Sequence, residues 1–270
     1  MTRIVTWNVN GIRAVIKKGF CEFLERERPD ILCLQEVKCT PEQMPVADLE
    51  RIGSLGYTVH WNPATKAGYS GVATFCRTDP LFVTPGAGFE RGEGRVIVTE
   101  HGDFTLYNCY FPNGRQTAAG PDPARLAFKL EFYQHLLEHI EEERAEGKNV
   151  IVTGDWNTAL EDIDLARPKE NQGQTGFLPE ERAALRRYVE HGWVDVFRHF
   201  HPARLYEGRN PEERDYTWWS YWPGARERNM GWRIDHFFVN SEMLPLLTDC
   251  SIWDDVQGSD HCPVVADLQV

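Results

Sequence analysis

Short runs rich in Val, Ile, Thr and aromatic residues recur along the whole chain, and this repetition constrains the fold more than any other feature. Gly, Pro, Asn or Asp residues bound each run, which is the pattern of short β-strands separated by turns. A chain of this kind must fold around β-sheets. The predicted strands are residues 4–7, 31–35, 57–61, 72–76, 96–99, 104–110, 150–153, 216–219, 234–239 and 264–268.

Two segments between these runs have a helical pattern. Residues 124–146 carry apolar side chains at alternating steps of four and three, on one face of a helix: Leu126, Leu130, Tyr133, Leu137 and Ile140. A second helix is predicted over residues 179–190, because Pro179 suits a first helical turn and Gly192 follows as a stop signal.

Strands in both halves of the chain, few helices and no linker-like stretch predict a single domain over residues 1–270. Hydrophobic residues make up 41% of the chain, enough to bury a substantial core. We therefore predict an α/β fold, a four-layer α/β sandwich of two packed mixed β-sheets flanked by helices. The polar, turn-rich segments 171–176 and 202–213 are predicted loops where substrate contacts would lie.

The cysteines and the hydropathy pattern indicate the cellular compartment in which the protein works. The seven cysteines are scattered, form no CxxC pair and follow no secretory signal, so they are predicted to be reduced thiols. No run approaches the roughly 18 apolar residues of a membrane span. We expect a cytoplasmic, monomeric protein without a signal peptide or a membrane partner.

The formal net charge of −12 argues at first sight against a polyanionic partner. Much of the acidic excess, however, lies in residues 138–146, which are most simply a solvated helix end. A basic binding face on an acidic body is one interpretation of the arginines that stand among aromatic residues further along the chain. A second interpretation is that the remaining carboxylates hold divalent cations. The arginines are Arg198, Arg204, Arg209, Arg214, Arg226, Arg228 and Arg233.

Hydrophobic strands end repeatedly in an acidic, amide or imidazole residue. If these strand ends converge on one edge of the sandwich, they surround a single cleft with carboxylates, amides and one imidazole. Taken singly, each such residue is more often a turn former, a helix cap or a satisfied interior group, and it is the repetition that favours a site. The residues are Asn8, Glu36, Asp155, Asn157, Asp235, Asp260 and His261.

The chemistry of this set is that of a hard cation and a phosphate. Carboxylate and amide oxygens without thiolates are ligands for Mg²⁺, for which Mn²⁺ can substitute, and no HExxH or Cys/His spacing indicates zinc. A metal, an imidazole and a free carboxylate are what hydrolysis of a phosphodiester requires, because the first two offset charge on phosphate oxygens while the carboxylate activates water.

The same residues carry a family resemblance. In order along the chain, residues 7–13, 34–39, 110–114, 154–157, 163–165, 231–235 and 258–263 resemble the motif set of the exonuclease III family of AP endonucleases, within the DNase I-like superfamily. The resemblance implies a DNase I-like fold and a Mg²⁺-dependent DNA repair nuclease. Such an enzyme hydrolyses the phosphodiester 5′ to abasic sites in double-stranded DNA, with 3′-phosphodiesterase and 3′→5′ exonuclease side activities.

The resemblance also implies residue roles. Glu36 is the expected main metal ligand, with Asn8 and Asp260 nearby and Asp155 and Asn157 bordering the metal. Asp155 is expected to activate the attacking water, Asn157 and His261 to contact the scissile phosphate, and Asp235 to hold the His261 imidazole. Tyr110 and Asn113 are expected to line the phosphate pocket. The expected pocket for the abasic sugar is Trp218, Trp232 and Ile234.

The substrate remains open on fold alone, because the same sandwich serves phosphodiesterases and phosphatases that act on non-DNA phosphoesters. Tryptophans interleaved with Arg226 and Arg228 fit stacking and phosphate contacts along DNA, although several of them could be core residues. A DNA-binding protein without catalysis is a third class. The intact set of Glu36, Asp155, Asn157, Asp235 and His261 argues against it.

Overall fold

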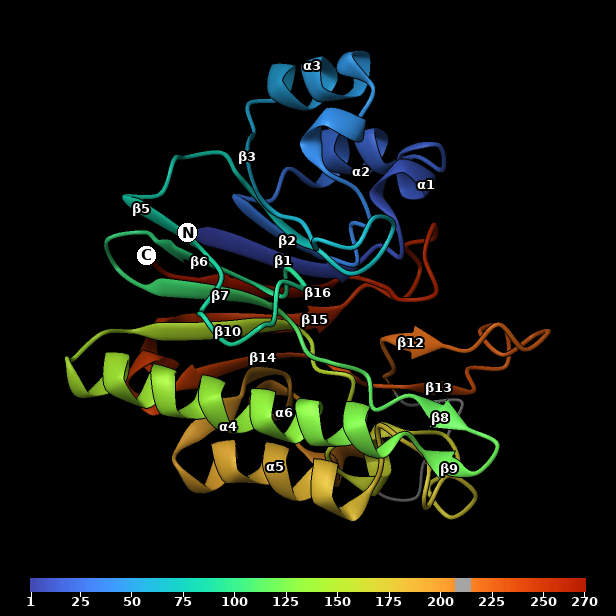
Figure 1. Ribbon diagram of the computed structural model, residues 1–270. Coiled ribbons are helices and arrows are strands. Elements are labelled where there is room, and N and C mark those ends of the chain that lie inside the picture. The colour runs from blue at the N-terminus through green and yellow to red at the C-terminus, as the bar shows by residue number, and fades with distance from the viewer. Residues whose placement is uncertain (207–214) are drawn as a thin grey trace.

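The computed structural model describes residues 1–206 and 215–270, and two six-stranded sheets form its centre (Figure 1). In the first sheet, with order β15-β16-β1-β2-β4-β3, only β1 and β2 pair in parallel. In the second, with order β11-β14-β10-β7-β6-β5, only β10 and β7 do. The strands of the first sheet are β1 (Thr2–Asn8), β2 (Ile31–Gln35), β3 (Thr58–Asn62), β4 (Val72–Cys76), β15 (Leu247–Ile252) and β16 (Val264–Leu268). Those of the second are β5 (Phe82–Pro85), β6 (Val96–Glu100), β7 (Thr105–Tyr110), β10 (Val150–Asp155), β11 (Trp193–Asp195) and β14 (Asp235–Asn240).

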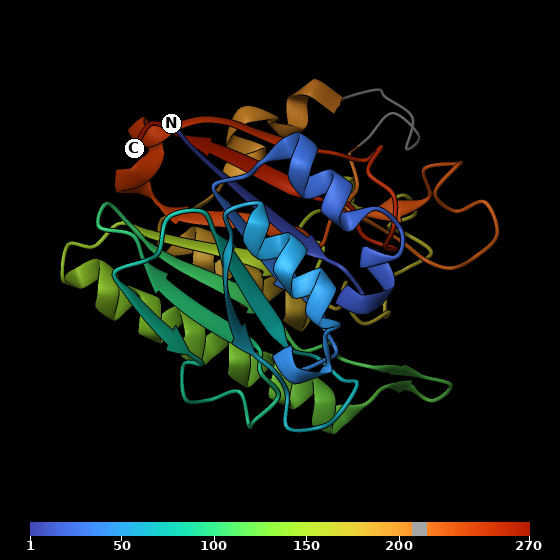
Figure 2. The same ribbon diagram turned by 90° about the horizontal axis from the view of Figure 1, so that it is seen from above.

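Helices cover the two outer faces, so the predicted four-layer sandwich of mixed sheets is confirmed (Figures 1 and 2). The first sheet is covered by α1 (Ile12–Ile16), α2 (Phe20–Glu27) and α3 (Val46–Ser54). The second is covered by α4 (Pro123–Ala145) and α5 (Pro179–Glu190), while α6 (Val196–Phe200) lies beside β14 and β15. Short 3₁₀ turns are η1 (Pro41–Gln43), η2 (Asp162–Asp164), η3 (Ala203–Tyr206) and η5 (Ser241–Leu246).

Two short ribbons extend from the end of the sandwich opposite the chain termini (Figure 1). One pairs β8 (Gln116–Thr117) with β9 (Gly120–Pro121), and the other pairs β12 (Trp218–Trp219) with β13 (Gly231–Trp232). The second ribbon contains part of the predicted strand 216–219. Only the last two of those residues pair as a strand. Of the predicted loops, 171–176 is a series of turns, and residues 207–213 lie outside the described residues, as do Arg209 and Arg214.

The long helix α4 begins where the Asp122 carboxylate accepts hydrogen bonds from the amides of Ala124 and Arg125, with Pro123 in the first turn. The predicted buried stripe is correct for Tyr133, Leu137 and Ile140. Leu126 and Leu130 are only partly buried, although Leu130 still packs against the core, and the rest of the buried face is formed by Phe128, Phe132 and Leu136.

The space between the two sheets changes character along the strands. Because strand side chains alternate between faces, every second residue of β1, β2, β7 and β10 points into this space. At the end near the termini these residues are apolar, in the middle they are polar, and at the far end they are the predicted site residues. In that order the three sets are Ile4, Ile31, Leu106 and Ile151; then Thr6, Asn108 and Thr153, with the Gln35 side chain hydrogen-bonded to Thr6 and Asn108; then Asn8, Tyr110 and Asp155.

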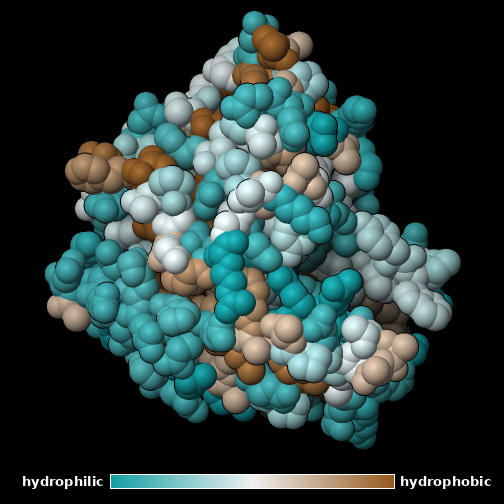
Figure 3. All heavy atoms as spheres, viewed as in Figure 1, coloured by the Kyte–Doolittle hydropathy of each residue, from teal (hydrophilic) through white to brown (hydrophobic). Residues whose placement is uncertain are grey.

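The surface is largely hydrophilic on the face shown, and the cysteines are free, as the sequence predicted. The face in Figure 3 is mostly hydrophilic, and hydrophobic residues gather at its edge over β5, where Leu81 and Phe82 are exposed. All seven cysteines are buried free thiols. In the described part of the chain no helix has both the length and the apolar character needed to cross a membrane.

Candidate active site

The predicted site residues converge on one cavity of about 550 Å³ at the edge where β10 and β7 end and β14 begins. Glu36, Tyr110, Asn113, Asp155, Asn157, Asp260 and His261 all line it, together with Trp218, Trp232 and Ile234. Asn8 lies directly behind, fully buried, between Glu36 and Asp155. The convergence that the strand ends predicted is therefore confirmed.

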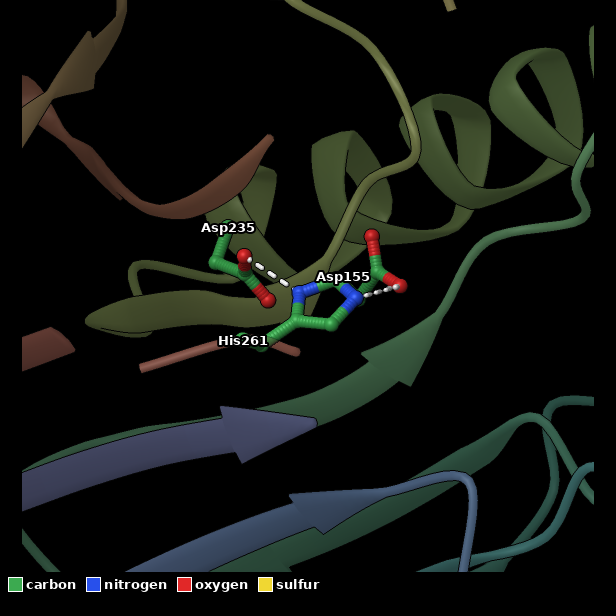
Figure 4. A group of neighbouring side chains, drawn as sticks. All are labelled: Asp155, Asp235 and His261. Carbon is green, nitrogen blue, oxygen red and sulfur yellow. Dashed lines mark hydrogen bonds and ion pairs between the residues drawn. The ribbon is translucent and has the colours of Figure 1, made fainter. Parts of the chain in front are cut away.

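His261 lies between two carboxylates (Figure 4). Its Nδ1 is 2.9 Å from Oδ2 of Asp235, and its Nε2 is 3.9 Å from Oδ2 of Asp155. The two aspartates come from paired strands, because Asp155 ends β10 and stands opposite Asp235, the first residue of β14. The Trp7 indole donates to the His261 carbonyl and anchors its backbone from β1. Both ring nitrogens of this histidine therefore face an acidic group.

The charges of this group shift its proton equilibria. Burial lowers the pKa of His261, but the charge and hydrogen bond of Asp235, with the charges of Asp155 and Asp260, raise it to about 10. Burial also raises the pKa of Asp155 to about 7, with the charges of Asp235 and Glu36 adding to the rise and that of His261 opposing it. Near neutral pH the imidazole is thus a cation, and the neighbouring carboxyl group can gain or lose a proton.

Glu36 stands on the first sheet's side of the cavity, with φ of 51° immediately after β2. Its Oε1 accepts hydrogen bonds from the Asn8 amide at 3.0 Å and the Tyr110 hydroxyl at 2.8 Å, and its Oε2 is 2.6 Å from the Lys38 ammonium. Burial raises the pKa of Glu36, but the Lys38 charge and these hydrogen bonds outweigh it and lower the pKa overall. The carboxylate is therefore ionised.

Two groups of side chains could hold a cation. Asp155, Asp235 and His261 place ligand atoms within 4.8 Å of one another, but His261 Nδ1 and Asp235 are already hydrogen-bonded to each other at 2.9 Å. Glu36 and Asp260 instead offer two ionised carboxylates that line the cavity, and Glu36 is hydrogen-bonded to the Asn8 amide. Burial raises the pKa of Asp260, yet the His261 charge and hydrogen bonds from Asn10 and Trp218 lower it overall. Such an all-oxygen set, with the Lys38 ammonium on Glu36 as the cation to be displaced, fits a hard metal.

The segment 154–157 is held rigidly at the cavity floor. Gly154 has φ of 138°, and a Cβ there would stand 1.8 Å from the Cys109 carbonyl oxygen, so the close approach of β7 requires glycine. Asn157 follows with φ of 51°. Its amide nitrogen donates to Asp155 and to the Phe111 carbonyl, while its amide oxygen accepts from Asn113. These contacts fix which side of the Asn157 amide faces the cavity.

The predicted sugar pocket is aromatic on two sides. Trp218 and Trp232 face each other across the β12–β13 ribbon, with ring centroids 6.0 Å apart and planes at 85°. Phe177 contacts the Trp232 ring edge to face, and Ile234 packs behind both tryptophans. Trp218 and Trp232 are only partly buried, so each offers ring surface to the cavity.

Among the described arginines of the arginine-rich stretch, Arg198, Arg226 and Arg233 are engaged within the protein and do not contribute to an open basic face. Arg198 and Arg233 form ion pairs with buried Asp164, and Arg233 also with Asp195. Arg226 donates to the carbonyls of Ser259, Asp254 and Val256, which engages both of its terminal nitrogens. Arg228 is exposed and borders a neighbouring hollow with Trp222 and Trp232. Of the two arginines predicted to contact DNA, Arg228 is the more accessible.

Several residues that shape the site escaped sequence reasoning. Lys38 lies inside the motif of residues 34–39, but the sequence predicted no role for it. Thr217 accepts hydrogen bonds from the amides of Ile234 and Asp235 and so holds the start of β14. Lys129 and Glu181 form a fully buried ion pair behind Asn157, and a lysine among the apolar residues of α4 was the signal that could have revealed it.

Comparison with known proteins agrees with this geometry. Residues 5–261 match the model of the endonuclease/exonuclease/phosphatase family. An exodeoxyribonuclease of Bacillus subtilis (strain 168) is 42% identical over 265 residues, 97% of each protein. A DNA repair nuclease of Danio rerio is 39% identical, covering 99% of this chain and 82% of the relative. The solved structure of an AP endonuclease from Archaeoglobus fulgidus superposes with a TM-score of 0.85 at 30% identity over 100% of both chains.

Proposed function

The chain belongs to the endonuclease/exonuclease/phosphatase family, and from this premise we propose that it is a DNA repair nuclease that incises the backbone 5′ to abasic sites in double-stranded DNA. The enzyme is a hydrolase of DNA phosphodiester bonds. 3′-phosphodiesterase and 3′→5′ exonuclease reactions are proposed side activities, because they break the same bond type at a strand end. The observation that carries the proposal is His261 between Asp235 and Asp155 in a cavity that also has an aromatic pocket.

Asp155 and His261 are the groups proposed to act on the scissile phosphate. The Asp155 carboxylate orients a water molecule for attack on phosphorus and takes up its proton, for which a pKa of about 7 is well matched. The protonated His261 imidazole donates from Nε2 to a non-bridging phosphate oxygen, while Asp235 keeps the ring oriented through Nδ1. Asn157, Asn113 and Tyr110 complete the phosphate contacts.

The proposed metal is Mg²⁺, with Mn²⁺ able to substitute. Glu36 would hold it, with Asp260 and Asn8 nearby and Asp155 and Asn157 bordering it, and when bound it would neutralise charge on the phosphate and the leaving oxygen. Lys38 would then release Oε2 of Glu36. Tyr110 donates to Oε1 of Glu36 and so keeps the carboxylate aimed at the cavity.

Selection of the lesion is proposed to lie in the sugar pocket. Extruding a nucleotide from the duplex costs a few kcal/mol, and least where no base has to be unpaired. Trp218, Trp232 and Ile234 would pack on the bare deoxyribose and leave no room for a base. We also propose that the enzyme acts as a monomer. Seven buried free thiols support a cytoplasmic location.

Incision of defined duplexes tests the proposal. An end-labelled duplex with one stable abasic analogue should be cut 5′ to the lesion in Mg²⁺ and left intact in EDTA, while an undamaged duplex should be cut far more slowly. Glu36→Gln should raise the Mg²⁺ concentration needed, whereas Glu25→Gln, an exposed position on α2, should not. Full activity after exhaustive chelation contradicts the metal assignment. Hydrolysis of a small phosphoester such as an inositol phosphate, without incision of the abasic duplex, would favour the non-DNA alternative.

A further inference from the structure

The two sheets are joined by a buried polar contact in the middle of their interface, between its apolar end and the active site. Gln35 on β2 and Asn108 on β7 are both completely inaccessible to solvent. The Gln35 amide nitrogen donates to Oδ1 of Asn108 at 2.8 Å and to the Thr6 hydroxyl at 2.9 Å. Gln35 and Thr6 belong to the first sheet and Asn108 to the second, so the first of these bonds crosses between sheets.

Further hydrogen bonds fix the orientation of Asn108. Its amide nitrogen donates to the Ala73 carbonyl at 3.0 Å and to the Thr74 hydroxyl at 3.1 Å, both on β4 of the first sheet. Since that nitrogen faces oxygens, Oδ1 must face Gln35. A strand of the second sheet is thus tied to β2 and β4 of the first at a single register.

These residues stand one step from the catalytic edge. Gln35 immediately precedes Glu36, and Asn108 lies two residues before Tyr110 on the same face of β7. The active site is divided between the sheets, because Asn8 and Glu36 come from the first, and Tyr110 and Asp155 from the second. Its own links across the gap are the Tyr110–Glu36 contact at 2.8 Å and the Asn8–Asp155 contact at 2.8 Å.

Apolar packing alone does not hold such a site in register, because hydrophobic contact is non-directional and cores tolerate small displacements. A buried amide pair is directional, and a slip would leave it unsatisfied. We propose that Gln35 and Asn108 are positioning residues that lock the register of the two sheets and so set the spacing of Glu36 from Tyr110 and Asp155. This inference rests on the proposed function of that site.

The effect of Gln35 and Asn108 on the register of the sheets can be separated experimentally from their effect on the stability of the fold. Gln35→Leu leaves Oδ1 of Asn108 buried without its donor, and Asn108→Leu removes one acceptor of the Gln35 amide, which keeps the Thr6 hydroxyl and the Cys33 carbonyl. Replacing both amides by apolar groups of similar size removes the unsatisfied Asn108 oxygen. Gln35→Leu and Asn108→Leu should therefore each lower the melting temperature, and the double variant should recover most of the loss. If the amides set the register, the double variant should still have a kcat roughly 10- to 100-fold below wild type, as expected for misplaced catalytic groups.

The test measures the melting temperature, kcat and KM on the abasic duplex, and the Mg²⁺ concentration at half-maximal thermal stabilisation. The double variant should need several-fold more Mg²⁺, with little change in KM. Leu106→Ala is the matched control, because Leu106 lies on the same face of β7 at its other end. It should lower the melting temperature without shifting the Mg²⁺ requirement. A double variant with recovered stability, wild-type kcat and wild-type Mg²⁺ response overturns the proposal.

Two other outcomes also bear on the proposal. If the double variant does not fold, Thr74→Val removes one first-sheet acceptor of the Asn108 amide at nearly constant shape. It must then raise the Mg²⁺ requirement, and an unchanged requirement overturns the lock. If wild type does not incise abasic DNA, the proposed function fails separately, and the Mg²⁺-dependent thermal shift still decides the role of the amide pair.

Discussion

Asp155 is the most constrained side chain of the site. Its Oδ1 accepts from the Asn157 backbone amide at 2.8 Å, and its Oδ2 accepts from the side-chain amides of Asn8 at 2.8 Å and Asn157 at 3.2 Å. These donors hold the buried Asp155 carboxylate in one orientation beside His261. Burial raises the pKa of this carboxyl group to about 7 and outweighs the Asn8 hydrogen bond, which lowers the pKa, so the group can take up a proton as activation of water requires.

Asp155→Asn should abolish most turnover while DNA affinity is kept. The side chain keeps its shape but can no longer take a proton, so kcat should fall by about 10²–10⁴ or more. Single-turnover kinetics and a DNA-binding titration measure the two effects separately. Near-normal turnover would assign the base to another residue. Asp235→Asn is the companion variant, and wild-type behaviour there would contradict the pairing with His261 Nδ1.

Trp232→Ala should weaken incision at abasic sites much more than binding to undamaged duplex. The ring is only partly buried and lines the cavity, so its loss opens the pocket and relaxes discrimination against intact nucleotides. Trp193→Ala is the matched control, because Trp193 is fully buried and remote from the cavity. That variant should lose about 3–5 kcal/mol of stability and lower all activities together. If Trp232→Ala shows the same uniform loss, tracking its melting temperature, the pocket assignment lacks support.

At the scale of elements, α4 and α5 are joined by a buried ion pair. Lys129 Nζ lies 2.7 Å from Oε1 of Glu181 and 2.6 Å from the Asn157 carbonyl oxygen. Glu181 also accepts from the amides of Gly176 and Leu178. The pair thereby links two helices, the turns that border the cavity and the backbone of a site residue.

Lys129→Met should destabilise the protein by about 3–5 kcal/mol, because it leaves the Glu181 carboxylate buried without a counter-charge. Urea denaturation at neutral pH measures this change. Arg187→Ala provides the contrast, since Arg187 donates to Gln134 between the same two helices at the exposed surface and should cost less than about 1 kcal/mol. Similar values for both variants would show that burial does not distinguish the two contacts.

At the scale of the whole molecule, a buried neutral histidine links stability to pH. His236 is fully buried in β14, its Nε2 bonds to the Thr158 carbonyl, and its Nδ1 faces the Arg233 guanidinium. Burial, followed by the Arg233 charge, lowers its pKa to about 4. In the unfolded chain the histidine pKa is near 6.5, so between about pH 4 and pH 6.5 the unfolded chain binds more protons than the folded one. The stability that neutral His236 contributes above about pH 6.5 is therefore lost as the pH falls toward 4.

His236 should contribute a loss of unfolding free energy on the order of 2 kcal/mol between pH 8 and pH 5, while the raised pKa values of His261 and Asp155 act in the opposite direction. His236→Gln should remove that contribution from the pH profile, whatever its own cost at pH 8. His135→Gln, at an exposed position of α4, should leave the slope unchanged. Urea denaturation at several pH values gives the profiles. Parallel profiles for wild type and His236→Gln would contradict the assignment.

The elements that sequence reasoning missed are those that depend on their neighbours. The edge strands β5 and β15 alternate irregularly and carry exposed residues, so no apolar run marks them. The helices α1, α2 and α3 are five to nine residues long and would be marginal in isolation. They persist because one face packs on the first sheet, a tertiary effect that local propensity does not contain.

The sequence by itself determined the central strands, the helices α4 and α5 and the identity of the polar residues at the strand ends, because side-chain periodicity and turn residues are local signals. Tertiary structure alone decided that Glu36 and Asp155 approach from different sheets, that Arg226 is held by backbone carbonyls and that Lys129 lies buried behind Asn157. These arrangements join residues far apart in the chain. Packing of complete layers sets their distances and charges, and no local pattern encodes that packing.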